Sequence, residues 1–133
     1  MDISSKRSMT ENESARVAVD LCYRIHKQYG PGLFESVYEK ILFHELKKKG
    51  LKVKQQVAVP LIHGDMIITE AFRADLIVEE KLLIELKSVD VLSPAYYKQV
   101  ITYLKLLNLN LGLLVNFNVG LIKEGIHRIV NNF

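Results

Sequence analysis

The chain has a single cysteine, Cys22, and no apolar run long enough to span a membrane. One thiol cannot build a disulfide framework or a thiolate-rich metal cluster, so a reducing compartment, the cytoplasm, is expected. The segment Met1 to Arg7 has no hydrophobic signal region, and no membrane partner is expected. Charge of one sign is also scarce, because the formal net charge is only +3. Such a charge permits an anionic partner without requiring one.

No linker rich in proline, glycine or serine divides the chain, and no internal repeat is visible. A length of 133 residues is enough for one domain with its own hydrophobic core. We therefore expect a flexible polar lead over residues 1–9 and a single domain over residues 10–133. Its composition, 49% hydrophobic and 25% charged, is typical of a soluble globular protein.

Two helices are predicted in the first part of the chain. Thr10 to Glu13 has the form of a capping box, and Gly30-Pro31 ends the helix that follows. A second helix is expected to begin near Gly32 and to end at Gly50. Its predicted buried face consists of Phe34, Val37, Tyr38, Ile41, Leu42 and Leu46.

From Leu51 onward the apolar residues change to a period of two, which is typical of strands. Val53, Val57 and Val59 are expected on one side of the first strand. In chain order the expected elements are strands 51–61, 66–78 and 82–89, a helix after Ser93-Pro94, a central strand 111–117 and an edge strand 125–130. This order, helix, helix, three strands, helix, strand, strand, predicts an α+β or mixed α/β fold on a mixed sheet of about five strands.

The second and third strands bring charged residues together. The expected cross-strand pairs are Val78 with Leu82, Leu76 with Ile84, and Ala74 with Leu86. The same register sets Asp75 opposite Glu85, with Arg73 and Lys87 beside them. Two facing carboxylates on a half-buried sheet repel each other unless a positive charge lies between them. The residue types therefore indicate a divalent cation.

This group has the composition of a metal-dependent phosphodiester-cleaving site. Asp75, Glu85 and the backbone carbonyl of Leu86 could supply oxygen ligands, and water could fill the other positions. Lys87 could orient the attacking water or neutralise the charge that develops at phosphorus. Alternatively, these charges simply decorate the solvent-exposed face of a hairpin. That face also carries Ile77, Leu83 and Val89, and the partial burial they predict favours a site.

Four motifs resemble those of a known superfamily. Phe72-Arg73-Ala74-Asp75 and Ile84-Glu85-Leu86-Lys87 resemble the PD-(D/E)XK nuclease signature, with Ala74 in place of its proline. Gly32 to Tyr38 reads G-x-x-E-x-x-Y and resembles the GxxExxY family of that superfamily. Gln99 to Tyr103 resembles the Q-x-x-x-Y element of RecB-type and lambda-type exonucleases. The resemblance covers about residues 10 to 130 and implies a restriction-endonuclease-like core.

The resemblance also implies roles for individual residues. Asp75 and Glu85 would be the principal ligands of Mg²⁺ or Mn²⁺, Glu35 would complete the metal shell, and Lys87 would be the catalytic lysine. Gln99 and Tyr103, one helical turn apart, would contact phosphate or support the Glu85 strand. Glu35 could instead be an acid favoured by the helix dipole, and Tyr103 a core aromatic residue.

Other basic residues could contact nucleic acid. Arg73 could bind phosphate, although a structural pairing with Asp75 is the favoured interpretation. A basic cluster could follow a nucleic-acid backbone, although a solvated helix end is favoured. The members of this cluster are Lys47, Lys48, Lys49, Lys52 and Lys54.

Two functions remain open from the sequence. The first is a Mg²⁺- or Mn²⁺-dependent nuclease that hydrolyses nucleic acid, with DNA favoured over RNA. The second is a catalytically silent module with a nuclease fold that binds nucleic acid or a protein partner. It is motivated by a chain that adds no recognition domain to the core. The exposed last strand also offers an edge for a homodimer.

Overall fold

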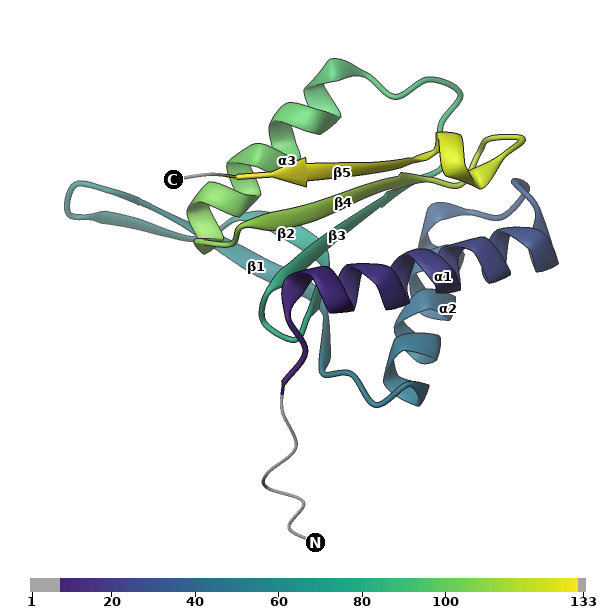
Figure 1. The fold of residues 1–133 in the computed structure, drawn as a ribbon. Helices are drawn as coiled ribbons and strands as arrows, with labels where there is room; N and C mark the ends of the chain where they lie inside the picture. The colour runs from purple at the N-terminus through teal and green to yellow at the C-terminus, as the bar shows by residue number, and fades with distance from the viewer. Residues whose placement is uncertain (1–7, 132–133) are drawn as a thin grey trace, which may run out of the picture.

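The computed structural model describes residues 8–131, which form a five-stranded mixed sheet with helices on both faces (Figure 1). The part of the predicted flexible lead that covers residues 1–7 lies outside the described residues. The elements are α1 (Glu11–Tyr29), α2 (Glu35–Lys48), β1 (Val53–His63), β2 (Met66–Val78), β3 (Leu82–Lys87), α3 (Pro94–Leu107), β4 (Leu111–Asn116), the short 3-10 helix η2 (Ile122–Glu124) and β5 (Ile126–Val130). This order confirms the predicted α+β fold.

The strands lie side by side in their order along the chain, β1-β2-β3-β4-β5. Only β3 and β4 are parallel, and α3 provides the crossover that a parallel pair needs. All six residues of β4 are buried, as predicted for a central strand, and β5 forms the predicted edge. Among residues 8–131, no helix combines the length and the apolar character needed to cross a bilayer.

Helix α1 begins and ends where the sequence predicts. The Thr10 side chain accepts a hydrogen bond from the Glu13 amide at 3.1 Å, and the Glu13 carboxylate accepts one from the Thr10 amide at 2.9 Å. These two bonds are the predicted capping box. Gly30 ends the helix with φ at 69°, a backbone conformation that glycine adopts at little cost.

Helix α2 begins later than predicted, at Glu35 instead of near Gly32. The Tyr38 hydroxyl donates to the Gly30 carbonyl and accepts from the Leu33 amide at 3.1 Å, so it holds the preceding segment as a loop. Tyr38 is fully buried as predicted. The expectation that Phe34 and Val37 are buried is wrong, because they are 81% and 36% exposed.

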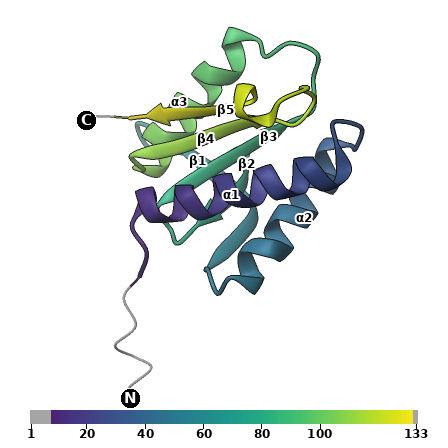
Figure 2. The same ribbon diagram turned by 45° about the vertical axis from the view of Figure 1, so that its right-hand side comes forward.

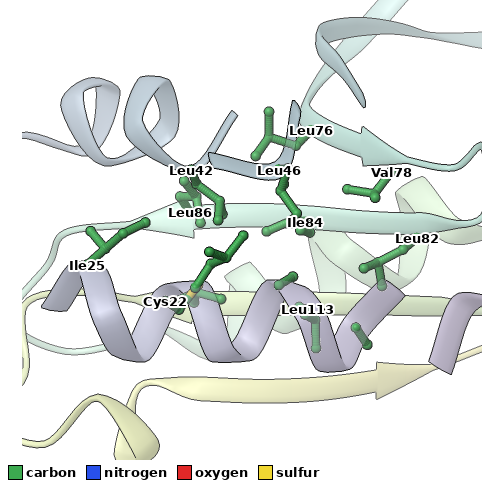
Figure 3. Close-up of a cluster of buried hydrophobic side chains, with 14 of the residues drawn as sticks. Cys22, Ile25, Leu42, Leu46, Leu76, Val78, Leu82, Ile84, Leu86 and Leu113 are labelled. Carbon is green, nitrogen blue, oxygen red and sulfur yellow. The ribbon is translucent and has the colours of Figure 1, made fainter. Parts of the chain in front are cut away.

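Hydrophobic cores lie on both faces of the sheet. One core joins α1 and α2 to β2, β3 and β4, and Figure 3 shows its side chains pointing from both helices toward the strands. Cys22 is buried in this core. Figure 2 shows α1 running across the sheet on this side. The other core joins α3 to the opposite face and contains Val59, Ala74 and Leu83.

Two expectations about strand faces are wrong. Val53 packs in the core under α1 and α2, whereas Val57 and Val59 pack under α3. Ala74 likewise packs under α3, so it does not share a face with Leu86.

The reason for this change of face is local. The change of face occurs between the paired positions Gln55–Leu76 and Val57–Ala74. Gln56 lies there with φ at 52°, and this left-handed backbone interrupts the regular alternation of β1.

The outer half of the β1–β2 hairpin projects beyond the helices (Figure 1). It turns at His63-Gly64-Asp65 as predicted, with φ of Gly64 at 60°. Every residue from Ile62 to Glu70 is exposed. The cores therefore stabilise only the inner half of the hairpin.

We predict that Gly112→Ala destabilises the protein by about 1–3 kcal/mol. A Cβ atom at this position of β4 would lie 2.9 Å from Cγ1 of Val100 and would push α3 away from the sheet. Urea unfolding monitored by circular dichroism measures the change. Gly120→Ala is the control, since nothing lies within 4 Å of its added Cβ atom. Equal stability of the two variants would contradict the close packing of α3 on β4.

Candidate active site

Asp75 and Glu85 lie together where β2 and β3 stop pairing. The antiparallel ladder runs through Val78–Leu82 and Leu76–Ile84, as predicted, and ends there. Beyond it, the Asp75 amide donates to Oε2 of Glu85 at 2.6 Å, and the Leu86 amide donates to Oδ2 of Asp75 at 2.8 Å. Each carboxylate thus accepts a backbone hydrogen bond from the opposite strand.

Burial sets the electrostatics of this pair. Glu85 is only 3% exposed, and Asp75 is half-buried. Burial, and after it the neighbouring charge of Asp75, raises the pKa of Glu85 to about 8. Burial also raises the pKa of Asp75, to about 6, against the opposing effect of the Leu86 hydrogen bond. The surrounding protein therefore compensates only in part the negative charge that the fully ionised pair would carry.

Lys87 follows Glu85 by two residues. Its ammonium group lies 4.6 Å from the ring centroid of Tyr96, and its side chain is half-buried. Its positive charge opposes the upward shifts in the pKa of both Asp75 and Glu85, in which burial is the largest cause. Lys87 thus acts on the acids electrostatically, while the Tyr96 ring restricts where its ammonium group lies.

Two side chains hold the backbone that follows Lys87. Asn116, which pairs with Lys87 across the parallel strands, accepts from the Val89 amide at 3.1 Å and donates to the Val89 carbonyl at 2.9 Å. The Ser88 hydroxyl donates to the Leu33 carbonyl at 3.2 Å. The end of β3 is therefore tied both to β4 and to the loop before α2. The sequence analysis did not identify Asn116. An asparagine at the end of an apolar strand was the feature that could have revealed it.

Glu35 begins α2, and its negative charge contributes to the raised pKa of both acids, behind burial as the main cause. Within residues 8–131, no three His, Cys, Asp or Glu side chains are grouped so that they could hold a metal ion. Glu35 therefore does not join Asp75 and Glu85 as a third direct ligand in this arrangement. A contact through water stays a prediction.

Glu39 is a second acid of α2 near the site, and the sequence analysis missed it. Its carboxylate is buried and accepts hydrogen bonds from the amides of Gln55 at 2.8 Å and Gln56 at 2.9 Å. The Gln56 amide also lies 3.3 Å from Oδ1 of Asp75. Glu39 follows Glu35 by four residues, which places both on one helix face, and this spacing could have revealed it.

Helix α3 brings Tyr103 to the other side of the acids. Tyr103 is buried and packs against Phe72 with ring centroids 5.2 Å apart. Burial raises the pKa of its hydroxyl, and the charges of Glu85 and Asp75 raise it further. Gln99 lies one turn earlier on α3 and is half-buried. Tyr103 is thus both a core aromatic residue and a neighbour of the two carboxylates.

The favoured expectation for Arg73, a pairing with Asp75, is wrong. Arg73 donates to the Glu70 carboxylate and, at 3.0 Å, to the Gln56 carbonyl. It also does not lie opposite Lys87, because the β2–β3 ladder ends before that position and Lys87 pairs with Asn116. Arg73 thus supports the backbone of β1 at Gln56.

The predicted basic cluster is already partly neutralised. Lys52 and Lys54 approach Glu80, Lys48 approaches Glu45, and Lys47 lies over the Phe43 ring. Lys47 is also about 18 Å along α2 from Glu35, at a rise of about 1.5 Å per residue. A phosphate contact by this cluster stays a prediction, and the bonds to Glu80 and Glu45 favour the solvated helix end.

We predict that Glu85→Gln makes the metal-free protein more stable than the wild type at pH 8. Unfolded Glu85 loses its proton near its ordinary pKa of 4.5, whereas the folded protein retains that proton up to about pH 8. Wild-type stability should therefore fall as the pH rises from 5 to 8. Glutamine cannot ionise, so this variant should lose less stability over the same pH range. At pH 8 its free energy of unfolding should exceed that of the wild type by roughly 2 kcal/mol.

Urea unfolding in the presence of a chelator at pH 5 and pH 8 measures this difference. The matched control is Glu124→Gln, which removes an exposed acid of η2. If the stabilities of the wild type and Glu85→Gln change by the same amount between pH 5 and pH 8, Glu85 does not retain its proton in the folded state.

Comparison with known proteins assigns the chain to a superfamily. A family model described as the PD-(D/E)XK nuclease superfamily matches residues 12–129. Neither a curated protein nor a solved structure matches the chain. The match begins in α1, ends in β5 and includes both acids and Lys87. It does not single out the GxxExxY family, so that finer resemblance stays a prediction. This chain belongs to the PD-(D/E)XK nuclease superfamily.

Proposed function

We propose that this protein is a Mg²⁺- or Mn²⁺-dependent nuclease that hydrolyses phosphodiester bonds, with DNA as the favoured substrate. The observation that carries this proposal is the reciprocal hydrogen bonding of Asp75 and Glu85 beside Lys87. Membership of the superfamily supports a nuclease-like function. The choice of DNA rests on the resemblance of Gln99 and Tyr103 to the exonuclease motif.

The donor set at the two acids fits a divalent cation. Mg²⁺ in enzymes commonly binds one or two carboxylates and keeps several waters, so a third protein carboxylate is not required. One oxygen of each acid is fixed by a backbone amide, and no hydrogen bond within residues 8–131 engages Oε1 of Glu85. The raised pKa values, caused mainly by burial, support this fit, because Lys87 compensates the charge of the ionised pair only in part. When bound, the cation supplies a water of lowered pKa and polarises a phosphoryl oxygen.

The residues of the chain then perform distinct tasks. Asp75 and Glu85 would hold the cation, and Glu35 would assist them through water. Lys87 donates to a phosphate oxygen and neutralises the negative charge that develops there. The Tyr96 ring and the bonds of Asn116 and Ser88 keep this lysine in place.

Residues of α3 complete the proposed site. Burial is the main cause of the raised pKa of Tyr103, and the charges of Glu85 and Asp75 add to it, which supports a place for Tyr103 beside both carboxylates. We assign Tyr103 and Gln99 to phosphate contact or to support of the Glu85 strand. Arg73 is less suited to phosphate binding, because Glu70 already pairs with its guanidinium group.

We predict that Mg²⁺ or Mn²⁺ raises the melting temperature of the wild type but not that of Asp75→Asn. A cation at 100 times its Kd adds about 2.7 kcal/mol to the stability of the folded state. Asparagine can still accept the Leu86 hydrogen bond, but it removes one of the two charges that attract the cation. Differential scanning fluorimetry with titrated MnCl₂ or MgCl₂ measures the shift, and CaCl₂ tests its selectivity. An identical metal response in the variant would defeat the assignment of Asp75.

We predict that the wild type cleaves nucleic acid with Mg²⁺ or Mn²⁺ and that Lys87→Met lowers the cleavage rate at least about 100-fold. Labelled single-stranded and duplex DNA and RNA are incubated with each metal and separated on denaturing gels. Lys105→Met is the matched control, because Lys105 is exposed at the C-terminal end of α3. Equal rates for the two lysine variants would remove Lys87 from the mechanism.

The same experiment separates the nuclease from a silent module. A silent module would bind nucleic acid in a salt-dependent manner without turnover, and Asp75→Asn would leave that binding unchanged. Absence of both cleavage and metal binding in the wild type would overturn the proposed nuclease.

A further inference from the structure

One amide group joins two carboxylates from different elements. The Nε2 atom of Gln56 lies 2.9 and 3.0 Å from the two carboxylate oxygens of Glu39, and 3.3 Å from Oδ1 of Asp75. An amide NH₂ has two hydrogens, so one can serve each acid. Gln56 therefore connects α2 to the aspartate at the end of the β2–β3 ladder.

The backbone of Gln56 is also unusual. Its φ of 52° lies in the left-handed region, which a side chain with a Cβ atom occupies at a cost in free energy. The Arg73 guanidinium donates to the Gln56 carbonyl at 3.0 Å and stabilises this conformation. Strained residues are concentrated at functional sites, where the surrounding structure enforces them. Here the strain sits at the residue that contacts Asp75.

Glu39 supplies the other half of this arrangement. It is only 6% exposed, and no ion pair with a lysine or arginine involves it within residues 8–131. Its carboxylate is satisfied by two neutral amides, those of Gln55 and Gln56. Burying a carboxylate without a cation is unfavourable, so a purely structural role would be served equally well by a neutral residue. The Glu39 carboxylate, with both oxygens within 3.0 Å of Nε2, orients the Gln56 amide so that its hydrogens face both acids.

We propose that Gln56, oriented by Glu39, is a positioning residue that fixes the carboxylate of Asp75 for cation binding. Oδ2 of Asp75 is held by the Leu86 amide and Oδ1 by the Gln56 amide, so both oxygens are restrained. Side chains that orient metal ligands typically change metal affinity 10- to 100-fold when they are removed. The inference rests on the proposed metal site, but part of its test needs no metal.

The chain contains its own matched control. Gln55 and Gln56 are neighbours in β1, and both donate to Glu39, but only Gln56 also reaches Asp75. Methionine is close to glutamine in size and has no hydrogen-bond donor on its side chain. Gln55→Met and Gln56→Met therefore each remove an amide donor to Glu39, and only Gln56→Met also removes the contact with Asp75.

The first measurement uses the metal-free protein. Amide hydrogen exchange of Leu86, read by NMR, reports the bond from its N–H to Asp75. We expect Gln56→Met to accelerate this exchange about 10-fold relative to the amides of β4, and Gln55→Met to leave it within about twofold. Unchanged exchange in Gln56→Met, or equal acceleration in both variants, would overturn the positioning role.

The second measurement is Mn²⁺ affinity by isothermal titration calorimetry. Gln56→Met should weaken Kd about 10-fold, Glu39→Gln should weaken it in the same direction, and Gln55→Met should not. If the wild type binds Mn²⁺ and Gln56→Met binds it equally well, the positioning role is wrong while the metal site stands. If the wild type binds no Mn²⁺, the proposed function fails, and the exchange of Leu86 alone decides the position of Asp75.

A second variant protects the test against misfolding. Asparagine tolerates the left-handed backbone better than most residues, but its side chain is one methylene shorter and cannot reach both acids. If Gln56→Met does not fold, Gln56→Asn should show the same faster exchange and weaker Mn²⁺ binding. Wild-type values in folded Gln56→Asn would overturn the inference.

Discussion

The reciprocal hydrogen bonds between the acids and the opposing backbone are the interaction on which the site depends. Where an antiparallel ladder ends, backbone amides lose their partners, and burial makes each unpaired amide costly. Here the side chains of Asp75 and Glu85 replace the missing carbonyls. Each bond satisfies an amide and fixes a carboxylate at the same time. The strands can therefore separate at this point, and the two acids remain adjacent despite their mutual repulsion.

The surrounding elements approach the end of the β2–β3 ladder from both faces of the sheet. Helix α2 approaches with Glu35 and Glu39, and α3 approaches with Tyr103 from the other face. The parallel neighbour β4 contributes Asn116, which holds the backbone just after Lys87. Several carboxyl groups thus gather in a largely buried region, and Lys87 is the lysine whose charge acts on both Asp75 and Glu85. The fold tolerates this cost at one place, which is the expected pattern when local stability is exchanged for function.

Much of this arrangement follows from the sequence, because the spacing of apolar residues clearly distinguishes the helices from the strands. The capping box of α1, the hairpin pairs Val78–Leu82 and Leu76–Ile84, and the buried central strand were all predictable. The change of face at Gln56 was not predictable, because the spacing of apolar residues does not reveal a left-handed residue inside a strand. That change moved Ala74 away from Leu86. The partner of Arg73 was also missed, because Glu70 and Asp75 both lie on the strand of Arg73 and only Asp75 was considered.

The single thiol of the chain has a practical consequence. Cys22 lies in the core under α1, and burial raises its pKa to about 12. A thiol in that state is neither ionised at neutral pH nor accessible to reagents, so it stays inert toward maleimides and disulfides. A cysteine introduced at an exposed position, such as the tip of the β1–β2 hairpin, would be the sole reactive sulfur. The protein thus accepts a fluorophore or spin label at a chosen site without removal of its native cysteine.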